Sequence, residues 1–155
     1  KKEIESFVLG GDGVWSVAML ESTIIEGKKS QDLRKEGKTS QEKIDKIIDR
    51  TKKGGAEIVK YLEKGSAFYA PAASGVEMAE SYLKDQKKQL PCAVYLDGQY
   101  GAKDIYAGVP VIIGKNGVEK VVEIQLSQKE KKDFDNSIKS VQELFDAAKK
   151  IDSAL

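Results

Sequence analysis

Hydrophobic and polar positions in the first quarter of the chain predict two strands and a polar connection. Ile4–Leu9 is a short apolar run that stops at Gly10-Gly11-Asp12-Gly13, which is typical of a strand entering a turn. Val14–Ile25 is rich in β-branched and apolar residues and predicts a second strand, which we expect to form a hairpin with the first. Gly27–Lys38 is polar and predicts a loop with a short helix around Asp32–Glu36.

The middle of the chain has the period of helices. Thr39-Ser40-Gln41-Glu42 has the pattern of a capping box, and apolar residues follow at helical spacing as far as Leu62. The pair Gly54-Gly55 interrupts this stripe and predicts a kink, because glycine is a poor helix former. Gly65 is expected to end this helix. A second one is expected from Ser66 or Phe68 to Lys87.

The last third of the chain predicts strands followed by one long helix. Pro91–Leu96 indicates a buried strand, and Val109–Ile113 and Val118–Ile124 flank a glycine-bounded turn that favours a hairpin. A capping box at Ser127–Glu130 begins a helix with one apolar face. No repeat or linker divides the sequence. Residues 1–155 are therefore expected to form one α+β domain, with a small, mostly antiparallel sheet and three long helices.

The composition argues against several kinds of partner. The 155 residues suffice for a buried core, and 26 basic against 25 acidic residues leave a net charge of +1. This balance creates no overall field that would attract nucleic acid or acidic lipid. No apolar run approaches the roughly 18 residues of a membrane span, and no signal peptide opens the sequence. We therefore expect neither nucleic acid nor a membrane as a partner.

The sequence contains no histidine and a single cysteine. Ser–His and Cys–His nucleophile pairs and histidine-ligated metals are therefore excluded, and we expect no metal site. Cys92 lies in an apolar segment and is interpreted as a buried strand thiol rather than a nucleophile. One cysteine cannot form an internal disulfide, which fits the reducing cytoplasm.

Several motifs occur together in one enzyme family. Gly65–Ser74 followed by Met78–Asp85 resembles the helix that lines the substrate pocket of malate dehydrogenases. Phe7–Gly11 resembles the strand that leads to their catalytic histidine, and Gly108–Val111 resembles part of their late hairpin. Over nearly its whole length the chain resembles the C-terminal substrate-binding domain of the lactate/malate dehydrogenase family. This resemblance implies that domain's fold, without a Rossmann domain.

The resemblance also places the family's site on this sequence. Where the family reads Gly-Gly-His-Gly, with histidine as the proton donor, this chain has Asp12, and Ser66, Ala67 and Pro71 match positions that face the substrate. The family's NAD-binding half and substrate-binding arginines have no counterpart in these 155 residues, so we expect no cofactor. An aspartate side chain normally titrates near pH ~4 and repels an anionic 2-oxo acid. We therefore expect no catalytic residue and no dehydrogenase activity from this chain alone.

Two residues near the altered motif have competing interpretations. Asp12 fits a catalytic carboxylate or a metal ligand, but Asp-Gly is a common turn sequence and we favour the turn. Trp15 fits either an interface anchor or a core residue. Trp15, Val14, Val17 and Met19 lie in a segment that departs from the family pattern. These four residues are the candidate surface for self-association or for a ligand.

The departures from the family pattern are localised. Lys28–Gln31 replaces an apolar segment and Lys38 a bulky apolar residue, as suits a surface that has lost its neighbour. The leading hypothesis is a catalytically silent, stand-alone domain derived from a malate dehydrogenase and engineered as a cytoplasmic scaffold, with homo-oligomer formation as one outcome. The alternative is part of an NAD-dependent malate/lactate dehydrogenase, an oxidoreductase acting on a 2-hydroxy acid/2-oxo acid pair. A third hypothesis is a new activity at Asp12 or Cys92.

Overall fold

The N-terminal quarter contains very short strands in place of the two longer ones predicted. The computed structural model describes residues 3–152. The predicted hairpin is present, with Leu9 opposite Val17. The continuous second strand is wrong, because a 3-10 turn at Gly13–Trp15 precedes it and a turn closed by Thr23 Oγ1 donating to Met19 O (2.6 Å) divides it. The strands are β1 Ile4–Glu5, β2 Val8–Gly10, β3 Ser16–Ala18, β4 Ile24–Ile25 and β5 Lys28–Lys29.

The helices follow the predicted pattern with corrected ends. The kink predicted at the glycine pair is a break at Lys53, whose φ and ψ of −96° and 3° are not helical. Ser40 caps the helix that follows it, accepting from Lys43 N at 3.3 Å, so the capping box predicted to begin at Thr39 is wrong. The capping box of Ser127 and Glu130 is confirmed. The helices are α1 Ser30–Lys35, α2 Gln41–Lys52, α3 Gly54–Leu62, α4 Tyr69–Leu83 and α5 Gln128–Ile151.

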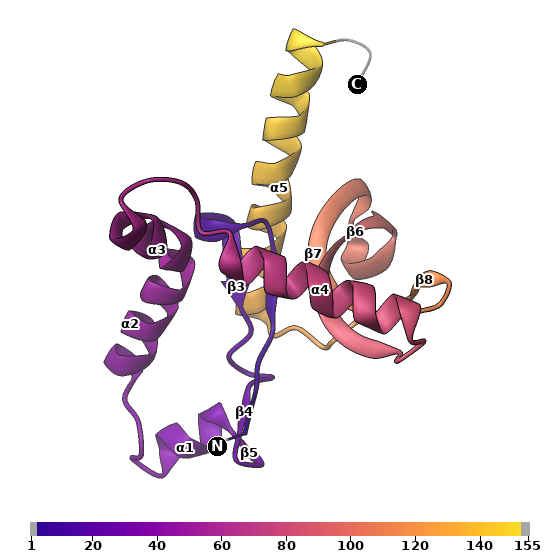
Figure 1. The fold of residues 1–155 in the computed structure, drawn as a ribbon. Coiled ribbons are helices and arrows are strands. Elements are labelled where there is room, and N and C mark those ends of the chain that lie inside the picture. Colours follow the sequence, from indigo (N-terminus) through magenta and orange to yellow (C-terminus); the bar gives the residue numbers. More distant parts are fainter. Residues whose placement is uncertain (1–2, 153–155) are drawn as a thin grey trace.

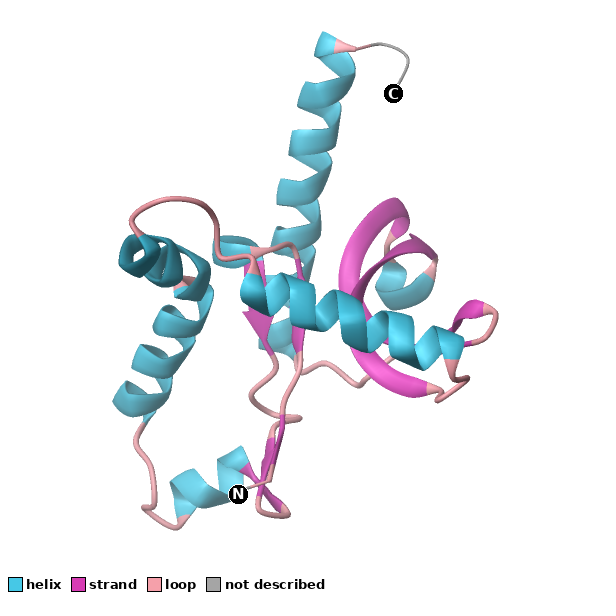
Figure 2. Cartoon of the chain, viewed as in Figure 1, coloured by secondary structure: helices cyan, strands magenta, loops and turns pink. Residues whose placement is uncertain are grey.

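The main sheet is antiparallel and centred on one long strand, which confirms the predicted fold class. Its remaining strands are β6 Lys88–Asp97, β7 Lys103–Gly114 and β8 Gly117–Val121. The order is β3-β2-β7-β6, and β8 also pairs with β7. A separate small sheet has the order β1-β4-β5. Figure 1 shows α4 crossing the main sheet and the end of α5 projecting beyond the body, and Figure 2 shows how strongly β7 curls.

The hydrophobic core lies where α5 packs against the main sheet. Phe134 of α5 is fully buried, together with Leu9, Met19 and Leu96. The ring of Phe134 lies 5.4 Å from that of Tyr100, centroid to centroid. The buried hydroxyl of Tyr100 donates to Val122 O at 2.6 Å, so the aromatic ring enters the core without leaving a polar group unpaired. These contacts hold α5 against the main sheet.

Two glycines allow β2 to approach β7 and α5 closely. Gly10 pairs with Gly108, and a Cβ on Gly108 would lie 2.9 Å from Gly10 O. Gly10 has a φ of +87°, and its own Cβ would lie 2.3 Å from Ser137 Oγ. Backbone atoms cannot move aside as the end of a side chain can. Glycine is therefore required on both strands at this crossing.

We expect Gly108→Ala to lower the free energy of unfolding by about 2 kcal/mol, because the added methyl group overpacks the crossing. Gly75→Ala is the matched control. Gly75 lies within α4 with nothing within 4 Å of an added Cβ, so this change should raise stability by about 0.5 to 1 kcal/mol. Urea denaturation followed by circular dichroism measures both. Equal effects of the two substitutions would contradict a steric role of the crossing.

Candidate functional site

The altered glycine-rich motif forms the turn that follows β2. Asp12 stands directly before the 3-10 turn in an extended conformation (φ −82°, ψ 156°), and its carbonyl accepts from Trp15 N at 3.3 Å. Its side chain is exposed and makes no capping hydrogen bond. The chain then enters β3 and not a helix, which is unlike the glycine-rich turn of a dinucleotide-binding fold. The geometry agrees with the interpretation of Asp12 as a turn residue.

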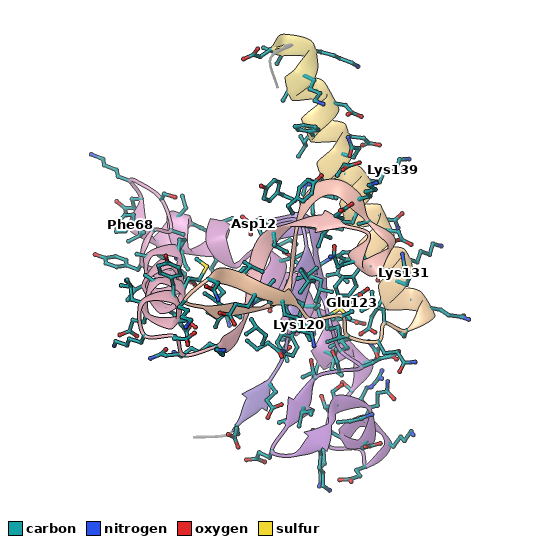
Figure 3. The ribbon with its side chains drawn as sticks, turned by 90° about the vertical axis from the view of Figure 1, so that its right-hand side faces the viewer. Asp12, Phe68, Lys120, Glu123, Lys131 and Lys139 are labelled. Atoms are coloured by element: carbon teal, nitrogen blue, oxygen red, sulfur yellow. The ribbon has the colours of Figure 1, made fainter. Side chains whose placement is uncertain are left out.

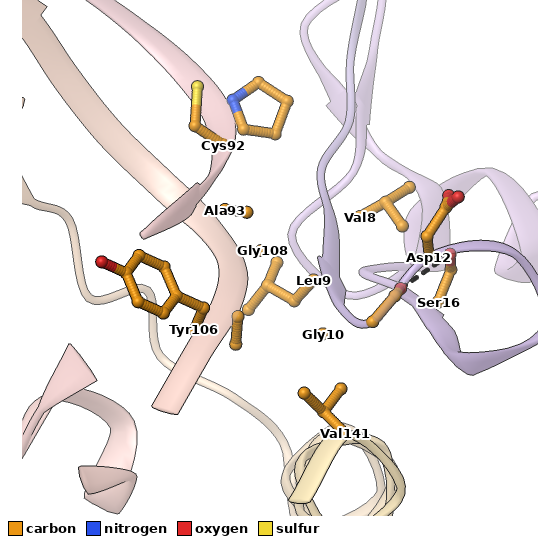
Figure 4. A pocket seen from close by; sticks show the side chains of 13 residues that line it. Val8, Leu9, Gly10, Asp12, Ser16, Cys92, Ala93, Tyr106, Gly108 and Val141 are labelled. Atoms are coloured by element: carbon orange, nitrogen blue, oxygen red, sulfur yellow. Dashed lines mark hydrogen bonds between the residues drawn. The ribbon is translucent and has the colours of Figure 1, made fainter. Parts of the chain in front are cut away.

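A shallow cavity of about 420 Å³ lies beside this turn. Figure 4 shows Asp12 and Ser16 at one side of it, facing Tyr106 and Cys92 on the other. Ser16 Oγ donates to Gly11 O at 3.1 Å, and this hydrogen bond connects the two ends of the turn. Among the described residues that line this cavity, Asp12 is the one with a carboxyl side chain, and none is Lys or Arg. The cavity therefore offers one carboxylate on a largely apolar surface, with no cation to bind the carboxylate of an oxo acid.

Ser137 of α5 fixes the position of the turn. Its buried Oγ accepts from Gly11 N at 2.8 Å and donates to Trp15 O at 2.6 Å, so one hydroxyl closes both ends of the loop. No pattern in the sequence had marked this residue as part of the site. The available signal was a serine on the apolar face of an amphipathic helix, one residue before Ile138, where a hydroxyl needs a partner.

The predicted substrate-facing residues lie outside the cavity beside Asp12. Ser66 and Ala67 precede α4 and Pro71 lies in its first turn. Ser66 and Pro71 are exposed, and none of the three lines the cavity beside Asp12. Figure 3 shows Asp12 well apart from Phe68, which follows Ala67 in the chain. The four residues named from the resemblance thus do not line this cavity together.

Cys92 lines the same cavity from β6. Burial raises the pKa of its thiol, so the protonated form is favoured at neutral pH. Its Sγ lies 3.4 Å from the Sδ of Met78 on α4. A half-buried, protonated thiol beside a thioether is a packing group, which agrees with the interpretation of Cys92 as a structural residue.

The four candidate interface residues divide into two pairs. Val17 is 6% exposed and Met19 is fully buried, because both point from the hairpin into the core. Val14 and Trp15 are 63% and 47% exposed. The candidate surface is thereby corrected to Val14 and Trp15.

Within residues 3–152, no three His, Cys, Asp or Glu side chains are grouped so that they could hold a metal ion. Over the same residues, none of the helices has the length and apolar character needed to cross a bilayer.

The fold, the glycine-rich turn and the position of α4 define the class of protein. Residues 1–152 match the lactate/malate dehydrogenase, alpha/beta C-terminal domain, and the chain belongs to this family. It is 62% identical over 154 residues to a malate dehydrogenase of Pelagibacter ubique (strain HTCC1062). The aligned region is 99% of this chain but 48% of that relative. The chain thus spans about half the length of the relative.

Solved structures of the family agree with this assignment. A malate dehydrogenase of Cryptosporidium parvum superposes with a TM-score of 0.90 at 46% identity, covering 95% of this chain and 47% of that one. The lactate dehydrogenase of Eimeria maxima, solved with NADH and oxamate, gives a TM-score of 0.92 at 39% identity, covering 97% and 47%. The polypeptide therefore has the fold of the C-terminal half of these enzymes.

We expect Ser137→Ala to lower the free energy of unfolding by about 2 kcal/mol or more, because Gly11 N and Trp15 O both lose their partner. Ser140→Ala on the same helix is the matched control. Ser140 Oγ donates only to Asn136 O at 3.1 Å on an exposed face, so its loss should change stability by less than about 0.5 kcal/mol. Thermal unfolding measures both, and a neutral Ser137→Ala would show that the turn is positioned by other contacts.

Proposed function

We propose that this chain by itself is catalytically silent in hydride transfer and acts as a stand-alone substrate domain of the lactate/malate dehydrogenase family, in the cytoplasm. The observation that carries this proposal is the carboxylate of Asp12, at the position where the resemblance places the family's histidine. Its exposed carboxylate stands beside a cavity whose described lining contains no cation. An anionic 2-oxo acid would meet repulsion there, since like charges disfavour binding.

The local chemistry supports the same conclusion. A proton donor to a ketone must be protonated at the working pH, and general acids are most effective when their pKa lies near that pH. Cys92, which lines the same cavity, is another group that could donate a proton. Its thiol contacts the thioether of Met78, and burial raises the pKa of the thiol. Neither Asp12 nor Cys92 pairs with a base in the way that activates a nucleophile. This also weighs against a new activity built on Asp12 or Cys92.

The alternative function is that of one half of an NAD-dependent malate or lactate dehydrogenase whose nucleotide-binding half is supplied separately. One observation favours it: large apolar side chains remain exposed on α3, α4 and α5. Tyr61 is 77% exposed, Leu83 78% and Ile151 90%. Apolar surface on this scale is typical of faces that another domain covers. The relative from Pelagibacter ubique is about twice as long as this chain, so its other half has the length of a further domain.

An engineered origin would fit the polar segment around α1. Glu36 pairs with Lys28 at 2.9 Å and with Lys38 at 2.6 Å, and both lysines replace residues that are apolar in the family pattern. The three side chains form a charged ion-pair cluster on the surface, as a deliberately solubilised face would. Self-association through the exposed Val14 and Trp15 stays part of this proposal.

The activity of the purified chain tests the two functions. We expect no oxaloacetate-dependent oxidation of NADH, followed at 340 nm, and none from Asp12→His alone, because the resemblance places the nucleotide site and the arginines outside these residues. The assay is then repeated with the N-terminal half of the Pelagibacter ubique enzyme added. Turnover by Asp12→His but not by Asp12→Asn or the unaltered chain would support a silenced domain. Turnover by the unaltered chain would support the alternative.

Glu36 provides a test of the polar cluster by pH. Hydrogen bonds from Lys38 and Lys28 lower its pKa from 4.5 to about 2. The cluster therefore contributes fully above pH 4.5, and its contribution is lost as the pH falls through about 2. Carboxyl carbon chemical shifts should show Glu36 titrating near this lower value. In Lys38→Met the midpoint should move back toward 4.5. An unchanged midpoint would show that the pair does not form in solution.

A further inference from the structure

A second cavity, of about 470 Å³, separates α1 and α2 from the N-terminal strands. One wall comes from β2, β3 and the turn after β3, and the other from α1 and α2. Both walls are mainly aliphatic, and the residues that define them are Val8, Ala18, Leu20, Leu33, Ile44 and Ile48. Val8 lines both this cavity and the one beside Asp12, but neither Asp12 nor any other residue of the glycine-rich turn lines this one, so the two are neighbouring and different cavities.

Most hydroxyl groups in the lining are already paired within the chain, and Thr39 contributes one further hydroxyl. Ser6 Oγ and Thr23 Oγ1 lie 3.0 Å apart, and Thr51 Oγ1 donates to Ile47 O at 2.8 Å. Ser30 Oγ donates to Leu20 O. Within residues 3–152, no buried side-chain nitrogen or oxygen lacks a hydrogen-bond partner. These walls therefore offer an occupant apolar contact and little hydrogen bonding.

The charges at the edge of the cavity do not favour an anion. Lys38 lines the cavity, but its ammonium group pairs with Glu36 at 2.6 Å. Glu26 also lines it and is exposed. Glu36 is shared between Lys38 and Lys28, and with Glu26 the formal charges of these four side chains sum to zero, so they provide no net charge to attract a negatively charged molecule. Burial of an ionised group without a partner is strongly unfavourable, so an uncharged molecule is favoured.

We propose that this cavity binds a small, uncharged, mostly apolar molecule. Apolar cavities of about 150 Å³ lined by aliphatic side chains already take up benzene, and sites for larger ligands begin at about 300 Å³. A cavity of about 470 Å³ therefore accommodates a ligand of two or three rings, or a branched aliphatic of similar size. The property goes beyond the proposed function, since it does not involve the site of hydride transfer.

Two related dyes test the chemistry. N-phenyl-1-naphthylamine is uncharged and fluoresces in apolar surroundings, and 8-anilino-1-naphthalenesulfonate is the same molecule with a sulfonate group. We expect the uncharged dye to bind one per chain and saturably, and the sulfonate to bind at least about tenfold more weakly. Equal or tighter binding of the sulfonate, or no saturable binding of the uncharged dye, would overturn the proposal.

Substitutions locate the site. Ala18→Phe fills the cavity from β3 and Ile48→Trp fills it from α2, so each should weaken binding of the uncharged dye at least about tenfold. Ala79→Phe, on the exposed face of α4, is the matched control and should leave binding unchanged. Circular dichroism confirms folding of each variant, and the two filling variants come from different elements. Full binding by both folded filling variants would contradict this location.

A protein occupant has a different signature. Two results together would show that the cavity is a contact for a protein. The N-terminal half of the Pelagibacter ubique malate dehydrogenase would protect the amides of α2 from exchange, and the uncharged dye would not bind to the chain. The proposal would then be wrong.

Discussion

The crossing of β2, β7 and α5 is the constraint on which the rest of the structure depends. Gly10 and Gly108 bring the two strands into backbone contact, and Ser137 occupies the space that a side chain on Gly10 would need. The same serine satisfies Gly11 N and Trp15 O. One small hydroxyl therefore joins the hairpin to the long helix. The core around Phe134 is built on this junction.

Features set by local sequence could be predicted well. The helices, the break near Gly54 and the capping box of Ser127 depend on residues within one or two turns of each other, where period and capping preference act directly. The hairpin closed by Gly114 and Gly117 is equally local. The family fold was recognisable for a different reason, because its motifs recur at matching positions along the chain.

Features set by distant partners could not be predicted. The short strand β4 pairs with β1, which lies on the other side of the β2–β3 hairpin in the sequence, and with β5, whereas β-branched composition alone indicated one continuous strand over Val14–Ile25. Val17 and Met19 lie on the core side of the hairpin, a face that is decided by α5 more than a hundred residues later. Ser137 was missed for the same reason. At the site, the sequence identified Asp12, but only the structure showed that Ser66 and Pro71 do not share its cavity.

The exposure of the side chain at position 12 has a consequence for how such a protein changes over generations. The turn is held by backbone atoms and by Ser16 and Ser137, so the residue that projects from it contributes no packing. A substitution at that point should therefore leave the turn and the surrounding fold intact. In this architecture, the chemical identity of the site and the survival of the scaffold are inherited independently.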